Sequence, residues 1–484
     1  RDRYRELHAR SAQLGQLMTF LSWRQRQAET DQLRSELEDV RRELNEIVSS
    51  LTVDFPAEIP LISEVMSRIH RDWVLVDYYI SRNNSFAFVL EKNRWSVVEL
   101  PLDYDSFFLY CYWMRNLDPE YGLVSPNDAS TMIAGQTSLR LGDQLLKPIL
   151  DVIGEKKNIL IVPHDLLYVF PYETMALREP DPLKNGHGVY LLDDNWIFAE
   201  IPSVFLLQKN KEILPTDPNN LSRLVIMANP ETWPKKPEDG NKNTRFIETY
   251  GMDFREMHKL LLDRLFVKDP YLQRIRRMWC PSIKVLQGTE KERDLISTAW
   301  RGFGVVDEYK GSDVSEKNLY DPKNKVWDAR YLHIACHGYD RGSIPDLQPG
   351  LALSPFEDKG NDSFAQMGEL AAFRWRSELI ALSACDTGLG ELFIGDGMLG
   401  LSTVFLAGGA KGMVISRWRV SDESAPLLME KMYSEIVAGK TPVHALASAK
   451  LAIKRGDHPA PSDTRRTQRT PNDWAVFKFV GVPW

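Results

Sequence analysis

Hydrophobic residues in the first 58 positions of the chain follow a seven-residue repeat. The apolar positions alternate four and three residues apart, with charged residues between them, so they line one side of a helix. They are Leu33, Leu37, Val40, Leu44, Ile47 and Leu51. We therefore expect residues 1–58 to be a coiled-coil-like helical segment that ends at Pro56 and Pro60. We favour a helical pair that packs on the rest of the protein, with a free dimeric coiled coil as the alternative.

Between Leu61 and Pro230 the pattern changes to short runs typical of β-strands. WVLVDYYI, SFAFVL and WSVVEL are joined by polar turns, which predicts three antiparallel strands. A helical stretch over 138–153 and a buried strand over 159–162 follow, and then a loop with a second short strand. LVIMANP is another buried strand, and the polar segment ILPTDPNNLS before it is the expected boundary between two halves.

The last third of the chain alternates strand and helix patterns, which predicts βαβ units and a mainly parallel sheet. The strand runs are KVLQG, YLHIACHG, ELIALSACDTG, GMVISRW and AVFKFVG, and the helical stretches lie near 291–303, 397–407, 423–436 and 443–453. We expect an α/β lobe over 59–220 and a larger one over 221–484. A helical insertion is expected over Met252–Trp279.

Composition narrows the range of functions. The 484 residues include 60 basic and 67 acidic side chains, a formal net charge of −7, which offers no general attraction for nucleic acid or membranes. No apolar run reaches the roughly 18 residues that a membrane span needs. Four scattered cysteines are too few for a disulfide framework, so we expect a cytoplasmic protein. The first residue is Arg1 rather than Met, so we expect a fragment or a processed form.

Two strand ends carry a histidine and a cysteine. YLHIACHG ends in His337 and Gly338, and Cys385 stands near the end of LIALSACDTG. If both runs are parallel strands, their carboxyl ends meet at the edge where sites of open α/β sheets form. A neutral imidazole beside a thiol is the general base that makes a nucleophilic thiolate. The pair therefore predicts Cys385 as a nucleophile and His337 as its base.

Small residues around this pair leave room for a peptide. Gly338 follows the histidine and Gly388 lies three residues after the cysteine, so backbone can approach a substrate carbonyl. The amides of Gly338 and Cys385 are the natural oxyanion donors of such a site. Ser383 and Ala384 would keep the approach to the sulfur open.

Neighbouring residues allow competing interpretations. Cys336 adjoins His337, but side chains alternate along a strand, so we expect Cys336 to point into the core with Leu332 and Ile334. His333 and His337 have a spacing that zinc ligands use on a helix. On a strand they lie about 13 Å apart, too far to share an ion. We expect no metal, and interpret His333 as a hydrogen-bonded histidine behind the site.

The segment GDGMLG is a formal match to the dinucleotide-binding pattern G-x-G-x-x-G, with Asp422 at a tolerable distance. It follows a loop rather than a strand, so we interpret it as a loop that enters a closely packed helix. A nucleotide-binding enzyme is the minor alternative. The P-loop pattern G-x-x-x-x-G-K-[ST] does not occur in the sequence, and we expect no cofactor.

Six segments in a fixed order resemble the CHAT family, whose domains are caspase-like and separase-like. They are IVPHDLLYVFPYETM, IMANPE, YLHIACHG, LIALSACDTGLG, DGMLGLSTVFLAGGAKGMVISRWRVSDES and NDWAVFKFVGVP. The resemblance covers roughly Leu61 to Val482, and an ordered match of six segments is more specific than any single motif. The separation of His337 and Cys385, 48 residues, is also close to the roughly 50 found in caspases.

The resemblance implies a fold and an activity. The fold would be a caspase-like three-layer α/β sandwich over 221–484, with a pseudo-caspase-like companion lobe over 59–220. The activity would be that of a cysteine endopeptidase that forms an acyl-enzyme, with His337 as base and Cys385 as nucleophile. Residues 1–58 would be the remnant of a linker after tetratricopeptide repeats. The alternative function is a catalytically silent scaffold that signals by protein binding.

The resemblance also implies partners. Proteins of this type often act in bacterial defence or programmed death and stay inactive until a partner releases them. We therefore expect a protein substrate and a regulatory protein or ribonucleoprotein activator. The substrate-binding candidates are Ser383, Asp386, Asp396, Arg417 and Arg419. The aspartates would favour a basic P1 residue and the arginines an acidic one, and we lean to a basic or uncharged residue.

Overall fold

The computed structural model describes residues 60–115, 137–179, 190–207, 222–231, 286–339, 350–354, 363–383, 391–393, 397–418, 420, 423–457 and 471–484. The helical segment expected over 1–58 and the insertion expected over Met252–Trp279 lie outside these residues. Within the described ranges, no helix is both long enough and apolar enough to cross a membrane.

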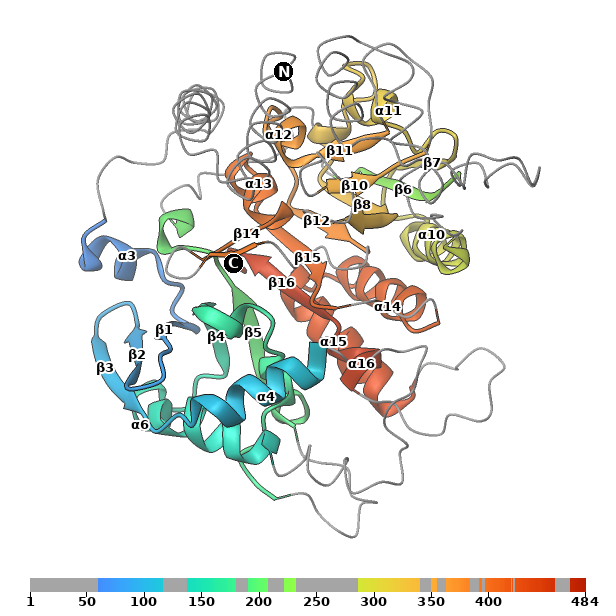
Figure 1. The fold of residues 1–484 in the computed structure, drawn as a ribbon. Helices are drawn as coiled ribbons and strands as arrows, with labels where there is room; N and C mark the ends of the chain where they lie inside the picture. Colours follow the sequence, from blue (N-terminus) through green and yellow to red (C-terminus); the bar gives the residue numbers. More distant parts are fainter. Residues whose placement is uncertain are drawn as a thin grey trace, which may run out of the picture.

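One sheet of eleven strands runs through the described part of the chain (Figure 1), in the order β3-β2-β1-β4-β5-β16-β15-β12-β8-β6-β7. Its strands are β1 (Trp73–Tyr79), β2 (Ser85–Leu90), β3 (Trp95–Leu100), β4 (Asn158–Val162), β5 (Ile197–Glu200), β6 (Leu224–Pro230), β7 (Val306–Gly311), β8 (Tyr331–Ala335), β12 (Leu379–Leu382), β15 (Gly412–Ser416) and β16 (Phe477–Gly481). The pairs β1–β2, β2–β3 and β15–β16 are antiparallel. All other neighbouring pairs are parallel, so the prediction of a mainly parallel sheet is confirmed.

The sheet is continuous between the two halves of the chain. β5, from the amino-terminal half, lies parallel to β16, and Glu200 stands opposite Val480. β16 also pairs with β15, so the last strand of the chain joins the two groups of strands. The boundary near residue 220 stays a prediction.

Helices cover both faces of the carboxyl-terminal half of the sheet (Figure 1). In β8, Tyr331 and Ala335 pack in one core cluster and Leu332 and Ile334 in the other, because side chains alternate along a strand. The helices of the first face are α10 (Gln287–Trp300), α14 (Ala425–Val437) and α15 (Pro442–Arg455), and those of the second are α11 (Glu316–Tyr320), α12 (Met367–Leu370) and α13 (Leu401–Ala407). The predicted three-layer α/β sandwich is therefore confirmed.

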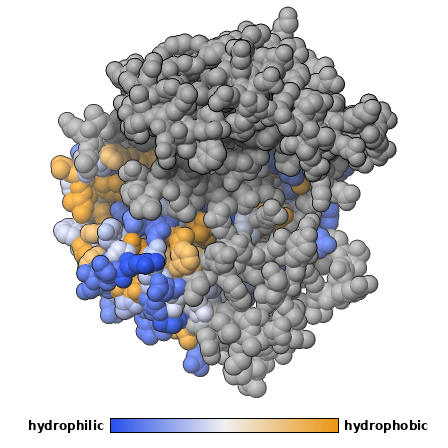
Figure 2. Space-filling view, viewed as in Figure 1, coloured by the Kyte–Doolittle hydropathy of each residue, from blue (hydrophilic) through white to orange (hydrophobic). Residues whose placement is uncertain are grey.

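Further helices complete the layers. They are α3 (Ile62–Arg68), α4 (Tyr104–Arg115), α6 (Leu150–Ile153) and α16 (Pro471–Trp474). Apolar side chains reach the surface at the start of α3, where Leu61 and Ile62 are exposed (Figure 2). β8 and β12 are instead buried at every position, which is typical of strands covered by helices on both faces.

Two expected strands are absent from the described residues. The run KVLQG was expected to be a strand, but its last two residues, Gln287 and Gly288, are the first two residues of α10 instead. After β4, two 3-10 turns, Asp165–Tyr168 and Tyr172–Thr174, replace the expected short strand. Prolines precede both turns in the sequence, and proline cannot donate to a strand ladder.

A small second sheet was not foreseen from the sequence. The run YLHIACHG breaks after β8, and its last residues begin β9 (His337–Tyr339), which pairs with β10 (Gly350–Ala352), and β10 with β11 (Phe364–Gln366). Within the GDGMLG segment, Gly397–Leu399 is β14, which pairs with β13 (Glu391–Phe393). The helix expected from residue 397 therefore begins at Leu401, as α13.

Candidate active site

The strands that carry the histidine and cysteine motifs are neighbours in the sheet. β8 and β12 are parallel, and Leu382 stands opposite Ile334. The amide of Ser383 continues this register, because it donates to the carbonyl of Ile334 at 2.9 Å. Residues opposite each other are 48 positions apart, as are His337 and Cys385. Cys385 itself lies outside the described residues, and Ser383 is the last described residue before it.

His337 stands two residues beyond the end of β8, at the carboxyl edge of the sheet. It is half-buried, and as the first residue of β9 it lies opposite Ala352. Gly338, the expected oxyanion donor, lies opposite Leu351 in the same pair of strands. The small sheet of β9, β10 and β11 therefore fixes the backbone of the His337–Gly338 motif beside the main sheet.

Cys336 is fully buried, as the strand alternation predicts. It packs in the same core cluster as Leu332 and Ile334, and its Sγ atom contacts the carbonyl of His337 at 3.6 Å. The prediction that Cys336 points into the core is confirmed. A thiol with no exposed surface is a poor nucleophile, which favours Cys385 as the reactive cysteine.

A buried polar cluster lies behind the strand ends, on the side of the sheet that α10 and α14 cover. The Ser383 hydroxyl donates to Glu292 Oε2 at 3.0 Å, and Glu292 Oε1 is 3.1 Å from His333 Nε2. The His333 Nδ1 atom is 3.3 Å from the Tyr433 hydroxyl. His333 has no exposed surface and Glu292 only 2%. The interpretation of His333 as a buried, hydrogen-bonded histidine is confirmed by its contact with Tyr433.

Glu292 and Tyr433 were missed by sequence reasoning. Glu292 lies on the same face of α10 as Ile296 and Trp300, which are spaced at four-residue intervals and fully buried. A carboxylate on an apolar helical stripe is costly to bury without a partner. That position is the only local signal in the sequence that marks Glu292. Tyr433, in the more apolar helix α14, carries no comparable signal.

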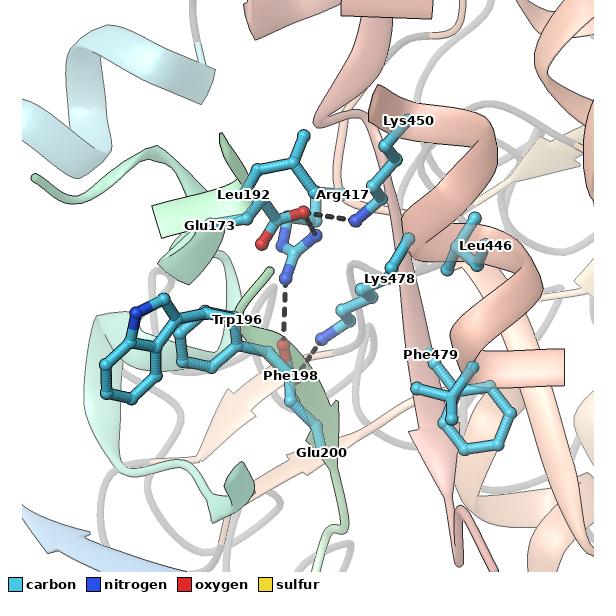
Figure 3. Close-up of a pocket in the computed structure, with 12 residues that line it drawn as sticks. Glu173, Leu192, Trp196, Phe198, Glu200, Arg417, Leu446, Lys450, Lys478 and Phe479 are labelled. Atoms are coloured by element: carbon cyan, nitrogen blue, oxygen red, sulfur yellow. Dashed lines mark hydrogen bonds and ion pairs between the residues drawn. The ribbon is translucent and has the colours of Figure 1, made fainter. Parts of the chain in front are cut away.

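Arg417, a predicted substrate-binding residue, is instead enclosed in a cluster of charges (Figure 3). Its guanidinium lies 3.3 Å from Glu173 Oε1 and 3.2 Å from Glu200 Oε1. Lys450 pairs with Glu173, and Lys478 Nζ is 2.7 Å from Glu200 Oε2. All five side chains are buried. Because both acceptor carboxylates hold Arg417, its direct contact with a substrate would require these pairs to break.

The charge cluster joins the two halves of the chain. Glu173 and Glu200 come from the amino-terminal half, and the three cations come from the carboxyl-terminal half. Three cations and two carboxylates leave one excess positive charge. Burial lowers the pKa of Lys450 to about 8. Burial alone raises the pKa of Glu173, but Arg417 and Lys450 outweigh it, and the net pKa is lowered.

The other predicted site residues are not all described. Asp386, Asp396 and Arg419 lie outside the described residues, as Cys385 does. Their assignment to substrate binding stays a prediction. Ser383 is described, and its hydroxyl is held in the interior by Glu292. The expected contribution of Ser383 to the S1 pocket also stays a prediction.

The fold and the edge geometry define an α/β sandwich whose two motif strands end side by side. The model of the CHAT domain family matches residues 136–482, which is most of the chain, and the protein belongs to this family. No curated protein matches the sequence.

Two of the solved structures that are similar to this chain have low sequence identity to it. One is the Saccharomyces cerevisiae separase–securin complex, with 10% identity and a TM-score of 0.43 over 87% of this chain and 30% of that chain. The other is the complex of the pro- and mature domains of Porphyromonas gingivalis RgpB, with 12% identity and a TM-score of 0.37 over 79% of this chain and 77% of that chain. A related structure is described as the Arg-specific cysteine proteinase gingipain R. The chain spans less than a third of the separase chain that it matches.

Proposed function

We propose that the protein is a caspase-like and separase-like cysteine endopeptidase, with Cys385 as nucleophile and His337 as general base. The observation that carries this proposal is the register of β8 and β12. It sets the two motif strands side by side and in parallel, with the same 48-residue offset that separates His337 from Cys385. Membership of the CHAT family supports the same assignment.

Chain length limits how far Cys385 can lie from this edge. The amide of Ser383 is bonded to Ile334, and two residues of extended chain span at most about 7 Å. This limit on the distance between Cys385 and the end of β12 supports the proposed imidazole–thiol contact with His337 once a substrate is bound.

The proposed reaction is acyl transfer. His337 takes the proton of the Cys385 thiol, and the thiolate attacks the scissile carbonyl. The imidazolium then gives this proton to the leaving amine, and water attacks the thioester to release the acid and regenerate the thiol. The amides of Gly338 and Cys385 are the proposed donors to the oxyanion, a contribution typically worth 10²–10³-fold per donor. No step calls for a metal or an organic cofactor.

Substrate recognition and control are further parts of the proposal. The substrate is a protein, and because Arg417 is held by Glu173 and Glu200, we favour a basic or uncharged P1 residue recognised near Asp386 or Asp396. A regulatory protein or ribonucleoprotein is the proposed activator, in a bacterial defence or programmed-death system. The alternative, a catalytically silent scaffold, makes the opposite prediction about the reactivity of Cys385.

Selective alkylation of Cys385 tests the proposed function. At neutral pH, iodoacetamide and a peptidyl chloromethyl ketone are expected to label Cys385 much faster than the fully buried Cys336. The measurement is mass-spectrometric site mapping in the wild type, Cys385→Ala and Cys336→Ala, with and without the products of neighbouring genes as candidate activators. A Cys385 no more reactive than Cys336 under every condition would favour the scaffold.

A further inference from the structure

Glu292 contacts both of the strands that carry the proposed catalytic residues. Its Oε2 atom accepts the hydrogen bond from Ser383, at the end of β12, and its Oε1 atom faces His333 of β8. The two strands also contact each other through the amide of Ser383. A single side chain of α10 therefore contacts both motif strands, β8 at its middle residue and the chain directly after β12.

The two contacts of Glu292 lie on one face of the main sheet. Ala381 pairs with His333, and side chains alternate along a strand, so Ser383 and His333 share a face. Ser383 stands two residues before Cys385 in the sequence and His333 four residues before His337, so Glu292 contacts each motif strand shortly before its proposed catalytic residue.

The cluster continues from Glu292 to a second helix. Burial raises the pKa of Tyr433 well above its ordinary value, so its hydroxyl keeps its proton and can donate to Nδ1 of His333. His333 Nε2 in turn lies 3.1 Å from Glu292 Oε1. The cluster of contacts therefore extends from Tyr433 through His333 to Glu292, which also accepts a hydrogen bond from Ser383.

An apolar side chain at position 292 would fill the same space at less cost. Ile296 and Trp300, on the same face of α10, are apolar and fully buried, and a buried carboxylate costs several kcal/mol unless it is paired. Core packing therefore does not account for a glutamate here. Its two oxygens each face one of the strands, which suggests a role in fixing their relative position.

We propose that Glu292 is a positioning residue, which fixes the ends of β8 and β12 relative to each other through His333 and Ser383. The proposal rests on the proposed function, because the quantity that Glu292 fixes is the separation of His337 and Cys385. A change of about 1 Å in such a separation can cost on the order of 100-fold in rate.

Ser383→Ala is the sharpest test, because it removes one hydroxyl and leaves Glu292 Oε2 without that donor. Ser377→Ala is the matched control. Ser377 is also fully buried, and it donates one hydrogen bond, to the carbonyl of Ala329 at 2.8 Å, but it precedes β12 at the opposite edge of the sheet. Ser383→Thr, which keeps the hydroxyl, tests rescue. Glu292→Gln and Glu292→Ala complete the set.

The readouts separate positioning from stability and from substrate binding. They are the rate of Cys385 alkylation by iodoacetamide, kcat and KM on fluorogenic peptides with Arg, Ala or Asp at P1, and the melting temperature. We expect Ser383→Ala to lower the alkylation rate and kcat about 10- to 100-fold for every peptide, with KM within about twofold. Ser377→Ala should lower the melting temperature by a similar amount and leave kcat within about twofold.

Each other outcome has a distinct meaning. Equal losses of kcat in Ser383→Ala and Ser377→Ala would overturn the positioning role in favour of general stability. A changed P1 preference in Ser383→Ala, with kcat kept for one peptide, would overturn it in favour of an S1 role. If wild-type Cys385 shows neither rapid alkylation nor turnover, the proposed function fails first, and the inference fails with it. Glu292→Ala with wild-type kcat would contradict the inference even if Ser383→Ala were impaired.

Discussion

Replacing Cys385 with alanine is expected to abolish proteolytic turnover, and His337→Gln to reduce kcat/KM by about 10²–10⁴-fold. The alanine variant has no thiolate to form the acyl-enzyme, whereas glutamine is of similar size to histidine but cannot take a proton from the thiol. The measurement is kcat/KM on the peptide cleaved best by the wild type, in the presence of any activator that the labelling experiment identifies.

The pH dependence of Cys385 alkylation distinguishes the loss of the general base from a loss of folding. An unassisted thiol ionises near pH 8.5, so Cys385 in His337→Gln should alkylate slowly at pH 7 and recover as pH rises past that value. Cys336→Ala is the control, because its buried side chain takes no part in the reaction; a modest loss of stability is expected, with turnover retained. Full activity in His337→Gln, or its loss in Cys336→Ala, would refute the assignment of the dyad.

The motif strands could be predicted because their signals are local. Short apolar runs predicted β8 and β12, and the register of these two strands in the structure shows that they are neighbours. The break after β8 was missed because β9 depends on pairing with β10, and that pairing involves residues further along the chain. The pattern of apolar residues indicates that a run is buried, but it does not indicate which other strand the run pairs with.

The polar clusters could not be predicted, because their partners are far apart in sequence. Ser383 and Glu292 are separated by 91 residues, and Arg417 and Glu173 by 244. The family resemblance suggested Arg417 as a substrate-binding residue, and nothing local in the sequence indicated the two carboxylates that hold it. The pairing of β5 with β16 is equally non-local, because β16 is the last strand of the chain.

The excess positive charge of the cluster around Arg417 predicts unequal effects when single members are neutralised. Glu173→Gln keeps the shape of the side chain but leaves three buried cations facing one carboxylate. We expect it to lower the free energy of unfolding by about 3–5 kcal/mol, the typical cost of leaving a buried charge uncompensated. Lys450→Met removes the excess charge and fills much of the same volume, so we expect a change of about 1 kcal/mol or less. Urea unfolding followed by tryptophan fluorescence measures both.

The pH dependence of stability, compared between the wild type and Lys450→Met, gives the sign of the contribution of Lys450 to stability. The pKa of Lys450 is about 8 in the folded protein against 10.5 for an ordinary lysine, so between these values the unfolded chain binds the extra proton. The contribution of Lys450 to stability therefore rises as pH increases from 8 to 10.5. This gain is lost again as pH falls from 10.5 to 8. The stability of the wild type relative to Lys450→Met should rise in that window.

Two results would contradict a governing role of the excess charge in the cluster. One is that Lys450→Met is as destabilising as Glu173→Gln at pH 7, and the other is that the stability of the wild type and that of Lys450→Met change in parallel with pH. The two halves of the chain would then be held together there by shape rather than by charge balance.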